Sequence, residues 1–332
     1  MDILNLEYST IEENFKLAMI NLHQEALLIN YINNEILNES ISDKIKSLKE
    51  KVISFFKVIR DKLKEIFDVF KDKIKDIRNK YHKNKILSKI SKLNESTNYF
   101  NESLKVSDIK FPQVYKDAAN FFDKYNGDEI EFGKLSMDFI EGKVSDNLKT
   151  CFKYIKEDIM KCVQKPNSID DNILIDKIKD TKTKIVKDAI YYMIPKDKIG
   201  FSENNIKDKI VKYWSDENNN NTKMITSNSD INNGFLIREM IRIISGTGLE
   251  DEFVNLQYKQ FMNDINEYEK KAYEILDSKN QSYLSNFLSL VESATSIGFQ
   301  VNSAVVQLYS KLISQCDNIL TNMVVYYAKL YK

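Results

Sequence analysis

Apolar residues recur at intervals of three and four along much of the chain, the spacing of one face of an α-helix. The longest repeat has twelve members and a mean spacing of about 3.64 residues, close to the 3.6 of a straight helix. Its members are Ile41, Ile45, Leu48, Val52, Phe55, Ile59, Leu63, Ile66, Phe70, Ile74, Ile77 and Tyr81. Residues 44–92 contain no Gly and no Pro, so the pattern predicts a long amphipathic helix there.

A second apolar repeat lies near the start of the chain. It consists of Phe15, Met19, Leu22, Ala26 and Ile29. Ser9 or Thr10 lies three residues before an acid, as in a capping box at a helix start. This pattern predicts an amphipathic helix that precedes the longer one.

The C-terminal third predicts two long helices. The first is expected from Leu249 to about Val291, and the second after Gly298. Apolar residues of the second alternate in steps of four and three, close to a heptad repeat. We expect a bend near Gly298 that folds the two helices into a hairpin. The residues expected to form its buried seam are Leu308, Leu312, Ile319 and Met323.

The middle of the chain has a less regular pattern. Pro166 and Pro195 bracket a predicted helix from Ile169 to Tyr192. Gly133 and Gly142 bracket a short element whose type the sequence leaves open. Ser215 and the run of Asn after it predict a loop near residues 215–222, because the stretch is polar and lacks apolar periodicity.

The composition favours helices joined by few turns. Only 8 of the 332 residues are Gly and 3 are Pro, far too few for the many turns of a β-sandwich or a doubly wound α/β domain. We therefore predict an all-α protein, an elongated multi-helix bundle with long amphipathic and coiled-coil-like helices. The predicted organisation is an acidic plus a basic helix at 1–92, an irregular helical region at 93–245, and the long-helix hairpin at 246–332.

Charge is distributed unevenly although the whole chain is neutral, with 49 basic and 49 acidic residues. Residues 1–43 hold eight acids and one base, whereas residues 44–92, the basic segment, hold 17 bases and 6 acids. Four interpretations of the basic segment are open. In the first, its apolar stripe packs on neighbouring helices and its lysines are solvated. In the second, the segment pairs with the acidic helix. In the other two, it binds either anionic lipid or nucleic-acid phosphate.

The candidate face for a polyanion or other partner consists of regularly spaced cations. They are Lys57, Lys64, Lys71, Lys75 and Arg78. Lysine far outnumbers arginine in the basic segment and Asn and Gln are sparse, which is typical of non-specific contacts rather than base readout.

Residues that carry catalysis or bind metals are not grouped in the sequence. His23 and His82 lie far apart, and neither belongs to a metal-binding pattern. Residues 245–248, Ser-Gly-Thr-Gly, lack the lysine of a phosphate-binding loop and are better explained as a helix stop followed by a helix cap. Three scattered cysteines do not form a disulfide framework. We expect no catalytic, cofactor-binding or metal-binding residues and therefore no enzymatic activity.

Neither a signal peptide nor a transmembrane segment is predicted. The N-terminus carries acids where a signal peptide needs positive charge. The longest uncharged stretch, Ser293 to Ser310, is too polar and barely long enough to span a bilayer.

The segment VISFFKVIRDKLKEIFDVFKDKIKDI, from Val52 to Ile77, resembles the Lys/Phe amphipathic runs in internal virion proteins of large tailed bacteriophages. The resemblance covers residues 1–90, and the long helical C-terminal portion also fits it. It implies a structural protein of the virion, present in the host cytoplasm during assembly and associated with the capsid, the genome or other shell proteins. Its partners would be other virion proteins, copies of itself, and nucleic acid bound non-specifically. The alternative is a peripheral protein that binds an anionic membrane surface through the basic segment.

Overall fold

A computed structural model describes the chain in separate stretches. They are residues 45–65, 67–69, 71–72, 75–76, 130–133, 135, 138–139, 141–163, 171–196, 205–220, 222–225, 257–277 and 283–330. The predicted acidic helix near residues 15–29 and Arg78 lie outside them.

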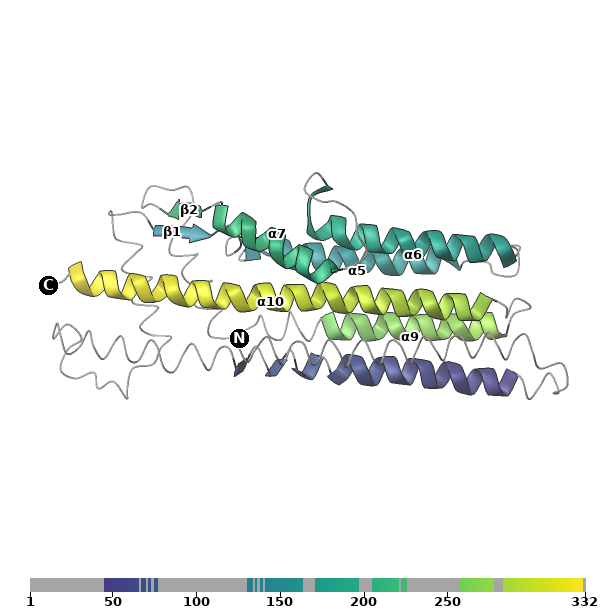
Figure 1. Ribbon diagram of the computed structural model, residues 1–332. Helices are drawn as coiled ribbons and strands as arrows, with labels where there is room; N and C mark the ends of the chain where they lie inside the picture. Colours follow the sequence, from purple (N-terminus) through teal and green to yellow (C-terminus); the bar gives the residue numbers. More distant parts are fainter. Residues whose placement is uncertain are drawn as a thin grey trace. The chain divides into compact units, whose positions relative to one another are not determined.

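The all-α prediction is confirmed, because helices dominate the described residues (Figure 1). They are α5 (Lys143–Cys162), α6 (Asp171–Met193), α7 (Ile206–Asn220), α9 (Gln257–Leu276) and α10 (Leu284–Leu330). The described helical residues between 45 and 76 are called the basic helix below. Within the described residues, β1 (Ile130–Gly133) and β2 (Thr222–Ile225) are the only strands, paired antiparallel with Ile130 opposite Ile225.

The chain forms two compact units, each assembled from three stretches of sequence. The first consists of Met1–Val69, Asn147–Lys207 and Leu256–Ser303, and the second of Phe70–Asp146, Asp208–Asn255 and Ala304–Lys332. These units do not coincide with the three predicted segments. The prediction divided the chain at changes in local pattern, whereas the units follow helix packing between distant stretches.

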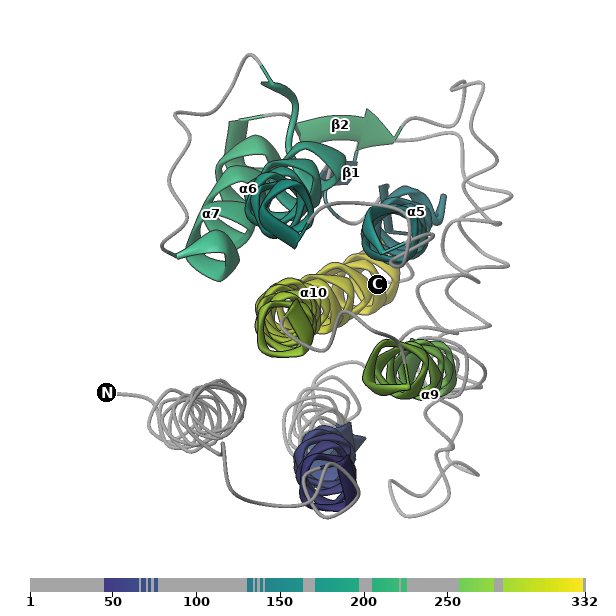
Figure 2. The ribbon, with the colours of Figure 1, turned by 90° about the vertical axis from the view of Figure 1, so that its right-hand side faces the viewer.

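The first unit buries the apolar faces of its helices against one another. In both ribbon views α9 lies alongside the first part of α10 (Figure 1 and Figure 2). The rings of Phe152 on α5 and Phe261 on α9 meet edge to face, with centroids 5.4 Å apart. Both rings also reach the backbone of α10 at Gly298, so the three helices meet there.

The predicted helix at 169–192 matches α6 closely. Its buried face includes Ile178, Ile185 and Ala189, which recur at helical spacing. The helix ends where Ile194 N–H still donates to the Ile190 carbonyl at 2.8 Å and Pro195 follows. The proline cannot extend the helix, as the sequence indicated.

The predicted bend at Gly298 is wrong. Helix α10 continues through Gly298 without interruption, and the single predicted helix 249–291 is instead divided, since α9 ends at Leu276 and α10 begins at Leu284. Residues 277–282 are Asp-Ser-Lys-Asn-Gln-Ser, a polar run that offers no apolar side chain to a buried face. In the sequence this polar run lies between the two helices, whereas Gly298 lies inside α10.

The predicted loop at residues 215–222 is also wrong for most of its length. Residues 215–220 form the last turns of α7, and 222–225 form β2. Ile210 and Trp214 are buried on one face of α7 and hold the helix in place. Ser215 Oγ donates to the Val211 carbonyl at 2.6 Å and accepts a hydrogen bond from Lys311 Nζ at 2.7 Å. Tertiary contacts therefore override the weak helix propensity of this polar stretch.

In the second unit, two of the four predicted seam residues can be placed. Leu308 and Leu312 on α10 are fully buried. Ile319 and Met323 belong to the same helix, but their side chains lie outside the described residues. Tyr309 is also buried and packs against Phe139, with ring centroids 6.2 Å apart.

Candidate functional site

The basic helix buries its apolar stripe in the first unit. Leu48, Val52, Phe55, Ile59 and Leu63 are each at most 2% exposed, whereas Ile45, at the start of the described helix, is half-buried. Phe56 is buried as well, with its ring edge to face against Phe55 at 5.2 Å. Since adjacent residues point about 100° apart on a helix, burial of both rings means that a wide arc of the helix is covered.

Polar and aromatic contacts fasten the basic helix to α9. Arg60 Nε donates to Asn266 Oδ1 at 3.1 Å, and the same guanidinium forms an ion pair with Glu269. Tyr273 Oη also donates to Glu269, at 3.2 Å, and Lys49 Nζ lies 5.8 Å from the centre of the Tyr273 ring. Arg60 and Lys49 therefore contribute to the packing of the bundle and are partly committed to it.

Four of the five predicted partner-face cations are exposed. These are Lys57, Lys64, Lys71 and Lys75; Arg78 lies outside the described residues. Six acids of the basic helix are exposed as well, namely Glu50, Asp61, Glu65, Asp68, Asp72 and Asp76. Residues 45–76 together hold ten bases and six acids, whereas residues 77–92 hold six bases and no acid. The cationic excess is thus concentrated towards the C-terminal end of the basic segment.

A partly buried ion-pair cluster connects α5 with α9. Lys156 Nζ lies 3.0 Å from Asp264 Oδ1 and 2.8 Å from Glu267 Oε1. The Asp264 side chain is only 8% exposed and that of Lys156 is 28% exposed. Burial raises the pKa of Asp264 although Lys156 opposes the shift, and burial lowers the pKa of Lys156 less than its two carboxylate partners raise it.

A second group of contacts connects α5 with α6. Lys184 Nζ binds Asp158 at 2.6 Å, and the rings of Tyr154 and Tyr192 stack with centroids 5.0 Å apart and an interplanar angle of 7°. Burial raises the pKa of Asp188, which lies in the same group. The pairs formed by the basic helix with α9, by α5 with α9 and by α5 with α6 are thus each joined by at least one charged or aromatic contact besides apolar packing.

The cysteines lack the surroundings of a nucleophile. Cys151, Cys162 and Cys316 are buried, and none of them forms a disulfide. Burial raises the pKa of the Cys151 thiol to about 12, so it is protonated and inert at neutral pH. Among the described residues, no three His, Cys, Asp or Glu side chains are grouped so as to hold a metal ion.

Two further findings bear on the site. No helix in the described part of the chain combines the length and apolar character needed to cross a bilayer. Comparison with protein-family models, curated proteins and solved structures gave no match.

The polar residues of the core were missed in the sequence analysis. Asp264 lies between Phe261 and Tyr268 on the buried face of α9, and Thr295 lies beside Ala294 on that of α10. A polar residue at an apolar-face position is a signal that the sequence does contain, because burying it requires a hydrogen-bond partner.

Proposed function

We propose that this chain is a non-enzymatic structural or interaction protein that engages a polyanionic partner through its basic segment. The observation that carries the proposal is that one face of the basic helix is buried while several of its lysines are exposed. Its apolar stripe is buried in the first unit while Lys57, Lys64, Lys71 and Lys75 remain exposed. The resemblance of residues 52–77 to internal virion proteins supports a place in a phage particle, against the genome or other shell proteins.

The burial of the aromatic residues favours phosphate over lipid as the ligand. An amphipathic helix binds a membrane by inserting its apolar face below the headgroups. Phe55 is 1% exposed and Phe67 is 6% exposed, with the Phe67 ring 5.1 Å from that of Tyr258. Insertion would require the helix to leave the bundle, whereas phosphate contacts require no rearrangement.

The acids on the exposed surface limit how strongly the helix itself binds. Residues 45–76 hold ten bases and six acids and therefore supply only a modest positive field. Residues 77–92 supply the larger part of the net positive charge. We therefore expect weak, non-specific and strongly salt-dependent binding, shared between the exposed lysines and the basic run that follows them.

The test is a salt series of duplex DNA binding by the full chain and by a variant with Lys57, Lys64, Lys71 and Lys75 all changed to Gln. Each phosphate contact contributes about −0.9 to the slope of log K against log salt. We expect the slope of the variant to be shallower by about 1 to 3, with an unchanged far-ultraviolet spectrum, because exposed lysines add little stability.

A matched control removes the same charge from other exposed positions. It carries Gln at Lys153, Lys182, Lys259 and Lys270, which are exposed on α5, α6 and α9. If the control flattens the slope as much as the test variant does, net charge rather than the basic helix governs binding. Co-sedimentation with anionic liposomes over the same salts examines the membrane alternative, which predicts binding that persists at high salt.

A further inference from the structure

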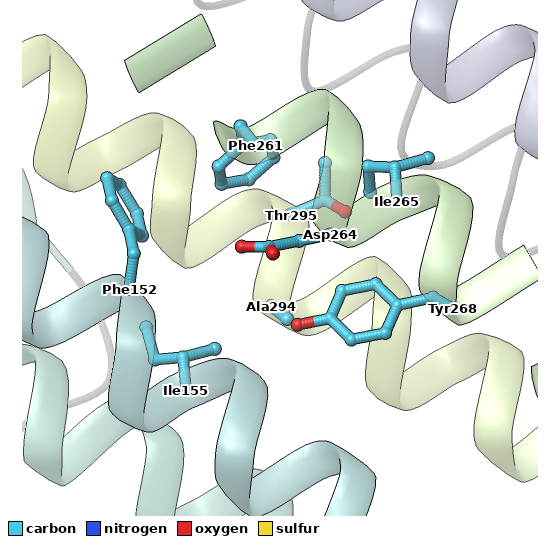
Figure 3. Close-up of a pocket in the computed structure, with 8 residues that line it drawn as sticks. All are labelled: Phe152, Ile155, Phe261, Asp264, Ile265, Tyr268, Ala294 and Thr295. Carbon is cyan, nitrogen blue, oxygen red and sulfur yellow. The ribbon is translucent and has the colours of Figure 1, made fainter. Parts of the chain in front are cut away.

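A small cavity lies between α5, α9 and α10 in the first unit (Figure 3). Its volume is about 10 Å³, close to the lower limit for holding one water molecule and too small for a larger ligand. Three polar side chains line it, those of Asp264, Tyr268 and Thr295, among apolar neighbours that include Phe152 and Ile155.

Tyr268 directs a hydrogen-bond donor into this space. The residue is 4% exposed, and its hydroxyl points in among the three helices towards Ala294 (Figure 3). Burial raises the pKa of Tyr268 well above its ordinary value, so the hydroxyl keeps its proton. A buried donor of this kind requires an acceptor.

The other two polar side chains offer acceptors. Asp264 Oδ1 accepts from Lys156 Nζ at 3.0 Å, and its second carboxylate oxygen, Oδ2, can accept a further hydrogen bond. Thr295 Oγ1 donates its only proton to the Val291 carbonyl at 2.8 Å and can therefore only accept another hydrogen bond.

We propose that the cavity is a binding site for one ordered water molecule, which accepts from Tyr268 Oη and donates to Asp264 Oδ2 and Thr295 Oγ1. One donor and two acceptors around a space of this size match the two protons and the lone pairs of water. A monovalent cation fits less well, since Lys156 already compensates the Asp264 charge and Tyr268 presents a proton. The bound water joins α9 to α10 and, through Asp264, to Lys156 on α5.

A high-resolution crystal structure of the full chain is the direct test. We expect one solvent peak in the cavity, with three contacts of about 2.7–3.2 Å to the named oxygens. An empty cavity would overturn the proposal. A peak that gains anomalous signal in crystals soaked in rubidium chloride would also overturn it, because the site would then bind a cation.

Oxygen-17 magnetic relaxation dispersion tests the same site in solution by counting long-lived internal waters. We expect the double variant Tyr268→Phe, Thr295→Val to lose one such water, because it removes two of the three partners. The matched control is Tyr258→Phe, Ser293→Ala. It deletes the same kinds of hydroxyl outside the cavity, including one that donates to the Ser289 carbonyl at 3.0 Å, and should keep the full count.

Thermal unfolding completes the comparison between the two double variants. The variant of the cavity should melt about 2–4 °C below the control, since Asp264 loses its link to α10. Equal counts of long-lived water in wild type and in the cavity variant would contradict the proposal, whatever the melting temperatures are.

Discussion

We expect the change of Lys156 to Met to lower the free energy of unfolding at neutral pH by about 2–3 kcal/mol, a little less than the effect of breaking a fully buried ion pair. The buried partner causes most of this loss. Asp264, whose side chain is 8% exposed, loses the ammonium group that compensates its charge. Lys156 itself is 28% exposed, and for that reason the expected loss is smaller than the loss from breaking a fully buried ion pair.

The loss of stability depends on pH, and the pKa of Asp264 determines whether the loss grows or shrinks as the pH falls. Burial already raises this pKa in the wild type, and removal of Lys156 raises it further because the lysine opposes that shift. A carboxyl group whose pKa is higher in the folded than in the unfolded state destabilises the fold above that pKa and has no effect below both values. The stability difference between variant and wild type should therefore shrink as the pH falls through the raised pKa, measured by urea unfolding between pH 4 and 8.

Two further variants separate the ion pair from other effects. Lys153→Met changes an exposed lysine one turn earlier on α5 and should alter stability by less than about 0.5 kcal/mol at any pH. Lys156→Met combined with Asp264→Asn replaces the carboxylate by a neutral group of the same shape, so it should recover much of the loss and remove its pH dependence. A Lys156→Met loss that stays constant with pH would show that lost packing of the lysine stem, rather than the Asp264 charge, causes it.

Periodicity predicted the buried faces of single helices well, because one helix face is a local property of the sequence. Leu48, Val52 and Phe55 were expected on one stripe of the basic helix and are all buried. The burial of Phe56 was not expected, since it lies off that stripe. The buried arc of the helix is therefore wider than the stripe, and the spacing of apolar residues within one helix does not report how many neighbours that helix has.

The ion-pair cluster could not be predicted because its partners are brought together only by packing. Lys156 and Asp264 lie 108 positions apart, on helices that each carry many other charges. What the sequence does show is a carboxylate at an apolar-face position of α9. That signal identifies Asp264 as a residue that needs a partner, but the choice among the lysines of the chain depends on the relative placement of the helices.

Gly298 shows how the same residue can support opposite interpretations. A glycine after an apolar run suggested a bend, because glycine commonly ends helices. In the structure it lies inside α10 where Phe261 and Phe152 approach the backbone, and a Cβ there would lie 2.6 Å from Phe261 Cζ and 3.3 Å from Phe152 Cε1. The glycine is required by a neighbour that is distant in the sequence, so only the tertiary structure distinguishes the two roles.

This close contact predicts that Gly298→Ala destabilises the protein, against the usual trend. In an open helix the change from Gly to Ala stabilises by about 0.8–1 kcal/mol. Here the new methyl group must displace a buried ring that is already packed edge to face against Phe152, and such overpacking typically costs about 1–3 kcal/mol. We expect a net loss of up to about 2 kcal/mol in the free energy of unfolding, measured in urea.

A double-mutant cycle with Phe261→Leu tests the cause of that loss, because leucine lacks the ring atoms that the methyl group would strike. Phe261→Leu alone should destabilise, since it leaves space between α5, α9 and α10. In this background the new methyl group of Gly298→Ala occupies part of the vacated space. The higher helix propensity of alanine then stabilises α10. The effect of Gly298→Ala should therefore change sign, from destabilising in the wild-type chain to stabilising by about 0.5–1 kcal/mol in the Phe261→Leu variant. Stabilisation by Gly298→Ala in both backgrounds would mean that the Phe261 ring moves aside freely, and that the contact at Gly298 does not restrain the packing of α9 on α10.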